Sequence, residues 1–465
     1  MSKPTREPNS SVPGSISPMR RRLAKWCLAP GLWLLYEVVL LVGLLLYLPK
    51  AVWRRRLPHR GWSMRLGRYP REVSDRLRGH PSVWIHAVSV GEVQAVRPLA
   101  AALAEATGDP LTVSTITPGG FALASTVAKD HGVAMYFPLD LRPCVRRALE
   151  AIRPRLLLLV ESEFWPTVIR SVKARGVPIA VVNGRISPRA FRRYRWVKPI
   201  LRRTLQEIDV FLMQSQADAA RVIALGAPAG KVQVAGSLKW DASVGTRPSE
   251  QAIAETAASL GLNGRDRVIV AGSTHRGEEE PLLDAFKIVR AAHGRRIRLI
   301  LAPRHLERLA EVEALVRQHG LTPVRLSASL GPGWDVGLVD RFGELPRYYG
   351  LATVAFIGGS LVPHGGQNPL EAASLGKPVV FGPFMHNFDE IAQQLVTHQA
   401  ARQLTRDEEL AAVLQQLVTN PGQAEAMGQR AQALIQRCQG TVQRTMALLA
   451  PLMAPGPSGK LGAPP

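Results

Sequence analysis

The chain has 465 residues and a formal net charge of +23 at neutral pH. This length provides for about two to three domains, and three widely separated cysteines without a CxxC pair argue against a disulfide framework or a zinc site. Residues 1–80 carry 16 Lys and Arg against 4 Asp and Glu, residues 81–203 carry 18 against 8, and the rest carry 25 against 24. The basic N-terminal half fits a protein that binds nucleic acid or one that lies on anionic lipid.

An apolar segment over residues 28–48 contains a single charged residue, Glu37, and has basic residues on both sides. About 20 apolar residues can span a bilayer as a helix, and the segment does not end like a cleaved signal peptide. We therefore expect a disordered basic tail over 1–27 and a membrane anchor helix over 28–53. Because both flanks are basic, the positive-inside rule does not decide the topology, and a helix that enters only one leaflet stays open.

Short apolar runs alternate with helical stretches through the rest of the chain. The expected strands are 83–88, 111–116, 156–160, 179–182 and 210–213, followed by 268–270, 297–301, 336–339, 354–357 and 379–381. This alternation predicts an α/β protein of two doubly wound, Rossmann-like domains that face a cleft. A polar break near 241–249 separates an N-terminal domain over 54–242 from a C-terminal domain over 243–432. A C-terminal helix and a frayed tail over 433–465 complete the chain.

Carboxylates follow two of the strands expected in the N-terminal domain. Glu92 comes after the first strand, where a general base for a sugar hydroxyl could lie, although a glutamate that only offsets a helix dipole has the same spacing. Glu161 and Glu163 follow the third strand. They could contribute to acceptor binding or cap a helix that contains Pro166 in its first turn, and for Glu163 capping is the favoured interpretation.

The stretch between Phe164 and Gln206 contains no acidic residue. Phe191, Tyr194 and Trp196 lie between its cations. A solvated helix face is the ordinary explanation of a charge run, but this many uncompensated cations also fits phosphate groups, lipid headgroups or single-stranded nucleic acid. The eight cations from residue 185 onward are Arg185, Arg189, Arg192, Arg193, Arg195, Lys198, Arg202 and Arg203.

Cations and hydrogen-bond donors follow strands of the C-terminal domain. Ser273, Thr274 and His275 end one strand, Arg304 and His305 end the next, and Lys239 precedes the domain break. Because ligands of open α/β sheets lie beyond the carboxyl ends of the strands, these side chains should face Glu92 across the cleft. The sequence has no Walker A motif, nucleophile elbow or HExxH, and no carboxylate cluster that demands a metal.

Two glycine pairs, Gly358–Gly359 and Gly365–Gly366, precede a short helix expected to have Asn368 as its N-cap and Pro369 as its first residue. A helix N-terminus behind a glycine loop can bind an anion, and Glu371 could accept hydrogen bonds from sugar hydroxyls. The alternative is that Asn368 and Glu371 form only a capping box.

Six motifs occur in order along the chain: VSVGE at 88–92, ESEFWP at 161–166, GSLKWD at 236–241, STHRGEE at 273–279, APRH at 302–305 and GGSLVPHGGQNPLEAA at 358–373. With them the chain resembles the 3-deoxy-D-manno-octulosonic acid (Kdo) transferase family of Gram-negative bacteria, from the apolar segment to about residue 449. The resemblance implies a GT-B fold and an inverting transfer of Kdo from CMP-Kdo to the lipid A precursor. It also implies that the reaction needs no metal or other cofactor and takes place at the inner membrane, with the catalytic domains in the cytoplasm.

The resemblance also implies roles for matching residues. Glu92 is then the general base, Lys239 assists catalysis, and Glu161 lies near the acceptor. The donor side comprises Ser273, Thr274, His275, Arg304, His305, Gly358, Gly359, Gly365, Gly366, Asn368 and Glu371. We assign Arg185, Arg189, Arg192, Arg193 and Arg195 to the acceptor and the membrane surface.

Two other functions stay open on the sequence. One is a GT-B transferase that uses a UDP-sugar. The other is a non-catalytic, membrane-tethered protein that binds glycolipid or nucleic acid, whereas the Kdo transferase interpretation needs no nucleic acid. The number of Kdo units transferred, the acceptor's acylation and the oligomeric state do not follow from the sequence.

Overall fold

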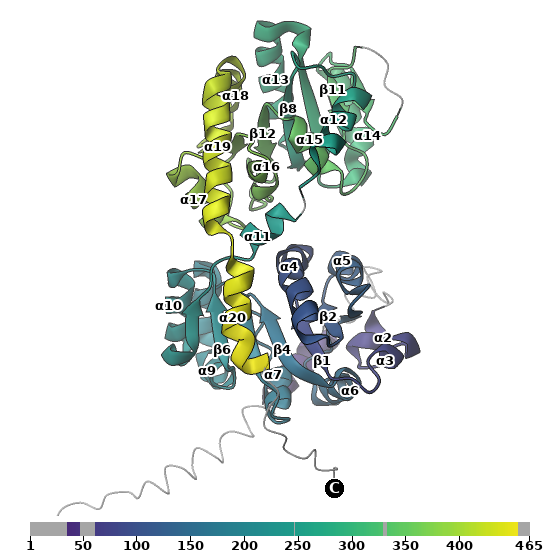
Figure 1. Ribbon diagram of the computed structural model, residues 1–465, viewed down its shortest axis with the longest axis vertical. Helices are drawn as coiled ribbons and strands as arrows, with labels where there is room; N and C mark the ends of the chain where they lie inside the picture. Colours follow the sequence, from purple (N-terminus) through teal and green to yellow (C-terminus); the bar gives the residue numbers. More distant parts are fainter. Residues whose placement is uncertain (1–34, 47–60, 246, 329–332, 454–465) are drawn as a thin grey trace, which may run out of the picture.

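The computed structural model describes residues 35–46, 61–245, 247–328 and 333–453. Two α/β domains, each built on a seven-stranded parallel sheet, lie one above the other (Figure 1). The expected architecture of two doubly wound domains is confirmed. The chain passes between the domains twice, and the candidate site lies where the domains face each other.

The N-terminal sheet has the strand order β3-β2-β1-β4-β5-β6-β7, and all its strand pairs are parallel. Its strands read as nearly continuous apolar runs because helices cover both faces. For example, Trp84 packs on one face, while Val83 and Ile85 pack on the other. The strands are β1 (Ser82–His86), β2 (Leu111–Thr115), β3 (Gly132–Tyr136), β4 (Pro154–Val160), β5 (Ile179–Gly184), β6 (Val210–Met213) and β7 (Val232–Val234).

The helices of this domain mostly begin at a Ser or Thr N-cap, or with a proline in the first turn. Ser89, Thr117, Ser187 and Ser215 each accept a hydrogen bond from a backbone N–H in the first turn. The helices are α2 (Trp62–Arg65), α3 (Arg71–Arg76), α4 (Val90–Thr107), α5 (Pro118–Ala128), α6 (Arg142–Ile152), α7 (Pro166–Lys173), α8 (Pro188–Trp196), α9 (Lys198–Gln206), α10 (Gln216–Leu225) and the 3-10 turn η1 (Ala229–Lys231).

The C-terminal sheet repeats the plan with the order β10-β11-β9-β8-β12-β13-β14. Two apolar clusters fill the spaces between its faces and the surrounding helices. The strands are β8 (Arg267–Thr274), β9 (Ile297–Pro303), β10 (Pro323–Arg325), β11 (Val336–Leu338), β12 (Val354–Ile357), β13 (Val379–Phe381) and β14 (Ala401–Gln403). The helices are α12 (Glu250–Ser259), α13 (Glu279–His293), α14 (Leu309–Gln318), α15 (Leu345–Leu351), α16 (Leu370–Ser374), α17 (Asp389–Thr397), α18 (Leu410–Thr419) and α19 (Pro421–Cys438), with 3-10 turns η2 (Gly294–Arg296), η3 (Leu306–Arg308) and η4 (Asp407–Glu409).

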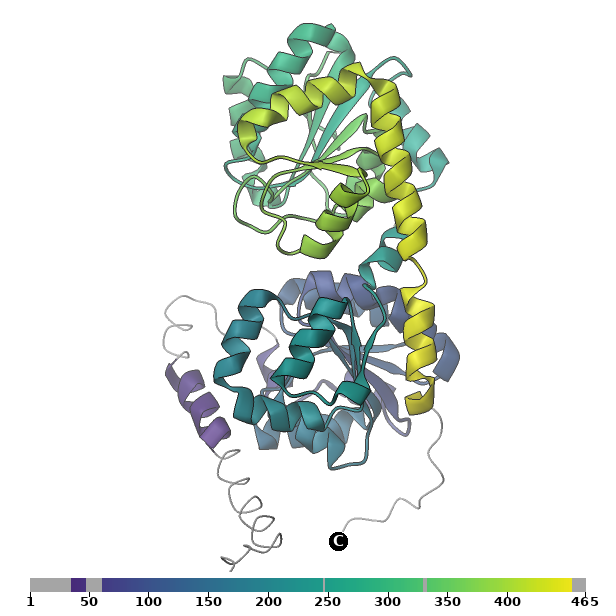
Figure 2. The same ribbon diagram turned by 90° about the vertical axis from the view of Figure 1, so that its left-hand side faces the viewer.

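The two passages between the domains meet at one carboxylate. The first passage is helix α11 (Lys239–Val244), and the second leads from α19 into α20 (Thr441–Met453). Asp241 on α11 accepts hydrogen bonds from the backbone N–H groups of Gly440 (2.8 Å) and Val442 (2.9 Å), so it ties the two passages together. In place of one helix from residue 433, the chain has α19 on the C-terminal domain and α20 on the N-terminal domain, where Val442 and Leu449 join the core (Figure 2).

Residues 35–46 form a helix beside the N-terminal domain (Figure 2). The Tyr36 hydroxyl donates to Asp140 (2.8 Å), and Arg142 donates to Glu37 (2.8 Å), so the one charge of the apolar segment has a partner. Among the described residues no helix is both long and apolar enough to cross a membrane. The rest of the expected anchor over 28–53, the tail over 1–27 and the expected frayed end over 454–465 lie outside the described residues.

Candidate functional site

Glu92 lies in the first turn of α4, just beyond the carboxyl end of β1. The backbone N–H of Val88 donates to one carboxylate oxygen (2.8 Å), and the Ser89 hydroxyl donates to the other (3.0 Å). Burial and, after it, the neighbouring charge of Glu161 together raise the pKa of Glu92 to about 8, against the effect of the Val88 hydrogen bond. Glu92 therefore caps its helix and also has the perturbed pKa of a candidate general base.

Glu161 and Lys239 lie in the same region as Glu92. The Lys239 ammonium is 3.8 Å from a carboxylate oxygen of Glu161, and these side chains are only 15% and 20% exposed. Burial lowers the pKa of Lys239, while the charges of Glu161 and Glu92 act in the opposite direction. The structure thus brings together both residues with a predicted catalytic role, Glu92 and Lys239, and the predicted acceptor residue Glu161.

Glu163 also belongs to this acidic group. The Trp165 indole donates a hydrogen bond to its carboxylate (3.0 Å). Burial raises the pKa of Glu163 to about 7, and Glu161 adds to that shift. The helix that follows, α7, has no side-chain cap, so Glu163 does not have the capping role that the sequence favours. Its carboxylate instead interacts electrostatically with that of Glu161.

Three strand ends near the candidate site carry a non-glycine residue with positive φ. These are Glu161 after β4 (φ 61°), Asn183 in β5 (φ 52°) and Ser273 in β8 (φ 56°). Such backbone is uncommon outside glycine and clusters at functional sites. Asn183, which the sequence analysis does not assign to the site, accepts a hydrogen bond from the Leu238 N–H (3.0 Å) and so holds the start of the helix that carries Lys239.

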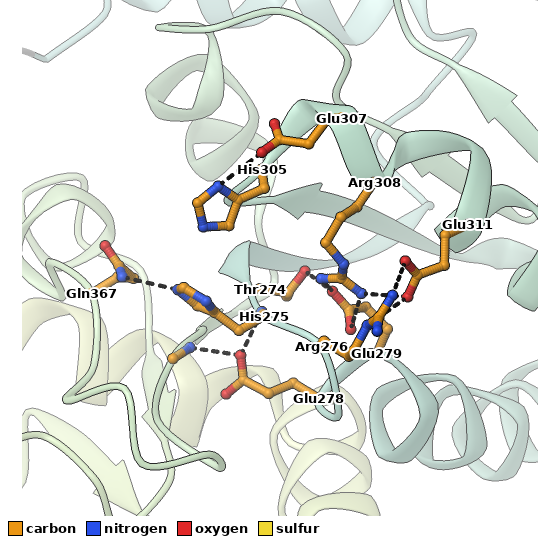
Figure 3. Close-up of polar contacts among 11 residues, drawn as sticks. Thr274, His275, Arg276, Glu278, Glu279, His305, Glu307, Arg308, Glu311 and Gln367 are labelled. Atoms are coloured by element: carbon orange, nitrogen blue, oxygen red, sulfur yellow. Dashed lines mark hydrogen bonds and ion pairs between the residues drawn. The ribbon is translucent and has the colours of Figure 1, made fainter. Parts of the chain in front are cut away.

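Three histidines gather at the strand ends of the C-terminal domain. The ring of His275 stacks on that of His364 (centroids 4.3 Å apart) and meets His305 edge-on (5.7 Å). Figure 3 shows His275 with the Gln367 amide, which lies 3.2 Å from its Nε2, on one side and His305 above. Burial lowers the pKa of His275 to about 4, and the nearby cations and histidines add to that shift. The sequence analysis misses His364, whose proximity only the loop geometry creates.

Arg304 and Glu371 lie on the same side of the C-terminal domain as these histidines. The positive charge of Arg304 acts on both Glu371 and His275. Burial raises the pKa of Glu371, and the Asn368 amide, which donates to its carboxylate (3.3 Å), counteracts that shift. The Thr274 hydroxyl instead points into the fold and donates to Glu279 (3.1 Å).

The first glycine pair does not present free N–H groups to a ligand. The buried carboxylate of Glu278 accepts hydrogen bonds from Gly359 (2.6 Å), Ser360 (2.9 Å) and Leu361 (2.8 Å). It accepts a fourth from the N–H of His275 (2.8 Å; Figure 3). The anion held by this loop is therefore part of the chain itself.

The second glycine pair and the helix behind it also differ from expectation. Gly365 (φ 94°) and Gly366 (φ 73°) lie against Asn387 and Met385, where a Cβ atom would collide with those side chains. Helix α16 begins at Leu370, one residue later than expected, and has only five residues. Asn368 precedes it and accepts a hydrogen bond from the Leu370 N–H (3.1 Å).

The arginines of the acid-free stretch divide into two groups. Arg185 donates to the backbone carbonyl of His386 in the C-terminal domain (2.7 Å), so it lies between the domains and not on the outer surface. The arginines of α8 are exposed, have no ion pair with any described residue, and precede a Trp196 that is 88% exposed. These arginines are Arg189, Arg192, Arg193 and Arg195. Across the described ranges, no group of three or more His, Cys, Asp or Glu residues could hold a metal ion.

Relatives of known activity match most of the chain. The model of the 3-deoxy-D-manno-octulosonic-acid transferase (kdotransferase) family matches residues 60–242. The 3-deoxy-D-manno-octulosonic acid transferase of Bordetella pertussis is 35% identical over 360 residues, which are 75% of this chain and 82% of the relative. That of Haemophilus influenzae is 33% identical and covers 68% of this chain and 74% of its own. A bifunctional glycosyltransferase/methyltransferase of Fusobacterium nucleatum is 36% identical over 349 residues, and the match covers only 53% of its length.

Solved structures share the fold at low sequence identity. The Anabaena protein HepE, solved with UDP and glucose, aligns with 80% of this chain and 99% of its own at a TM-score of 0.56 and 16% identity. A glycosyltransferase of Rickettsia africae aligns with 81% of this chain and all of its own at 0.57 and 10% identity. These likenesses establish the GT-B-like arrangement of the two domains. The relatives above show that the chain belongs to the 3-deoxy-D-manno-octulosonic acid (Kdo) transferase family.

Proposed function

We propose that the protein transfers Kdo from CMP-Kdo to the lipid A precursor lipid IVA in lipopolysaccharide synthesis. The observation that carries this proposal is the meeting of Glu92, Glu161 and Lys239 near the C-terminal domain, whose strand ends carry Arg304 and three histidines. A base from one domain and cations from the other are what a transfer between two bound substrates requires.

In the proposed reaction, Glu92 takes the proton from an acceptor hydroxyl. The hydroxyl oxygen forms a bond to the anomeric carbon of Kdo, while the bond from that carbon to the phosphate oxygen of CMP breaks. The bonding electrons leave with CMP, whose phosphate gains negative charge. Attack opposite the leaving group inverts the anomeric centre, and the proton stays on Glu92 until solvent removes it.

The cations of the site would stabilise the departing phosphate. Lys239 is largely buried, so its charge acts through a medium that screens less than water. Arg304 lies close enough to Glu371 and His275 for its charge to act on both. We assign these two cations to the leaving group, where fixed positive charge lowers the barrier most. The mechanism uses no metal ion or other cofactor.

We place the acceptor and the membrane on the side of α8. Its exposed arginines and Trp196 suit a surface of phosphorylated glycolipid and anionic phospholipid. The exposed apolar side chains of the helix over residues 35–46, among them Leu35, Val39 and Leu46, suit the same surface. We propose an inner-membrane location with the catalytic domains toward the cytoplasm.

The test is the mass of lipid IVA after incubation with CMP-Kdo and purified protein in detergent or vesicles. We expect the acceptor mass to increase by one or more Kdo units, with CMP released in equal number and with no need for added metal. Competition by CMP but not by UDP separates this function from that of a UDP-sugar transferase. No mass increase, or an increase only with a UDP-sugar, would overturn the proposal.

A further inference from the structure

A short segment of the C-terminal domain, residues 385–390, contacts both substrate sides of the candidate site. On the donor side, the backbone N–H of Asn387 donates to the Gly365 carbonyl (2.9 Å), and its side-chain amide donates to the His364 carbonyl (3.0 Å). Met385 fits against Gly366, where no side chain larger than hydrogen has room. The segment is therefore anchored to the second glycine pair and to the loop that carries His364.

The same segment contacts two cations of the N-terminal side, Arg185 and Lys239. The carbonyl of His386 accepts the hydrogen bond from Arg185 (2.7 Å). The Lys239 ammonium lies 4.7 Å from the centre of the Phe388 ring, within the range of a cation–π interaction. The charge of Glu390 acts on both Arg185 and Lys239.

Lys239 depends on these neighbours for its position because its own domain does not fix it. The separation of 3.8 Å from Glu161 is too long for a hydrogen bond, and the ammonium donates none to any other described residue. A lysine side chain has four rotatable bonds, so an ion pair of this length leaves it several rotamers. The ring of Phe388, approaching from the opposite domain, removes that freedom.

We propose that Phe388 is a positioning residue: its ring holds the Lys239 ammonium beside Glu161, and it does so only when residues 385–390 are seated on the glycine loop over 364–366. The glycine loop on the donor side thereby determines the position of the Lys239 ammonium, the cation that we assign to the leaving group. This inference rests on the proposed function in that it gives Lys239 a catalytic role. The alternative is that Phe388 only packs against the apolar core of the C-terminal domain, which it also contacts.

The experiment compares Phe388→Leu, Phe388→Tyr and Phe384→Leu. Leucine keeps the apolar bulk of the side chain but has no aromatic ring, whereas tyrosine keeps the ring. Phe384 lies four residues earlier, is 38% exposed and has no cation over its ring among the described contacts, so it is the matched control. We expect kcat/KM for Kdo transfer to fall about 5- to 30-fold in Phe388→Leu and to stay within about twofold of the wild type in the other two. CMP binding should be unchanged in all three.

A second readout separates positioning from packing and needs no Kdo transfer. The pH dependence with which an amine-reactive reagent labels Lys239 is followed by mass spectrometry. Loss of the ring removes a partner of the charged ammonium, so the labelling midpoint should move to lower pH by about 0.5 to 1 unit in Phe388→Leu and return in Phe388→Tyr. The alkaline limb of the transfer profile should move in the same direction.

The outcomes decide between the two proposals. Normal transfer by Phe388→Leu, or a loss that Phe388→Tyr does not restore and that leaves the labelling midpoint unchanged, would overturn the positioning role. A wild-type protein that transfers no Kdo would overturn the proposed function, while a midpoint shift confined to Phe388→Leu would still support the contact between the ring and Lys239.

Discussion

The protonation of Glu92 at neutral pH makes its role as general base testable through the pH dependence of transfer alone. Its pKa is raised to about 8, and a general base acts only when ionised. At pH 7 about one tenth of the protein then carries the active carboxylate, and at pH 9 about nine tenths. We therefore expect kcat/KM for transfer to rise about tenfold between pH 7 and pH 9 and to fall about tenfold for each unit below pH 7.

Substitution of Glu161 provides a second, independent test of the pKa of Glu92. After burial it is the largest cause that raises the pKa of Glu92, so Glu161→Gln should move the midpoint of the profile to lower pH. The removed charge also leaves Lys239 without an ion-pair partner, which favours the ionised Glu92 further. Because Glu161 also contacts Lys239, the midpoint and not the plateau is the quantity to compare.

The assay is the initial rate of CMP release with lipid acceptor over pH 6 to 9. Glu163 has a pKa raised to about 7 and titrates in the same window, so Glu163→Gln is profiled in parallel. Glu92→Gln should lower transfer about 10²- to 10⁴-fold with CMP binding intact. Glu105→Gln, an exposed glutamate of the same helix, is the matched control and should behave as the wild type. A flat profile from pH 6 to 9, or near-normal transfer by Glu92→Gln, would refute the reasoning.

Three further predictions concern stability and the surface. His86 is fully buried with a pKa lowered from 6.5 to about 3, so its contribution to folding is present above pH 6.5 and is lost as the pH falls toward 3. The free energy of unfolding should drop by about 2 kcal/mol between pH 8 and pH 5 through this residue, and His86→Gln should show a smaller drop in urea titrations. An equal drop in the free energy of unfolding for the wild type and His86→Gln would contradict the lowered pKa of His86. Glu278→Gln should lower the free energy of unfolding by about 1–3 kcal/mol, because an amide N–H group would face N–H donors, whereas Glu280→Gln at an exposed position should change little. Neutralising the four α8 arginines should weaken binding to anionic vesicles in co-sedimentation by about 1 kcal/mol per charge. Neutralising four exposed arginines of the C-terminal domain should not weaken this binding. Equal binding by both variants would mean that the α8 arginines only face solvent and do not bind lipid. The α8 set is Arg189, Arg192, Arg193 and Arg195, and the control set is Arg265, Arg402, Arg406 and Arg437.

The sequence by itself identifies the ten strands that lie inside the two sheets. Helices cover both of their faces, so their residues are buried and mostly apolar. The four strands that the sequence analysis misses, β3, β7, β10 and β14, are the outer strands of the sheets. Three of them, β7, β10 and β14, have only three residues with a glutamine or arginine among them, so they carry no continuous apolar pattern, whereas β3 is apolar and partly exposed. Pairing with an inner strand makes them strands, and that pairing is a property of the folded sheet.

The candidate site divides in the same way. Residues at strand ends, such as Glu92 and His275, could be found from the sequence because the carboxyl ends of parallel strands converge at one edge. The tertiary structure alone decided that Glu278 occupies the first glycine loop, that Arg185 reaches the opposite domain, and that Phe388 faces Lys239. Each of these contacts joins residues 81 to 201 positions apart. Local sequence sets backbone conformation and strand ends, but which distant group fills a loop depends on how two whole domains pack.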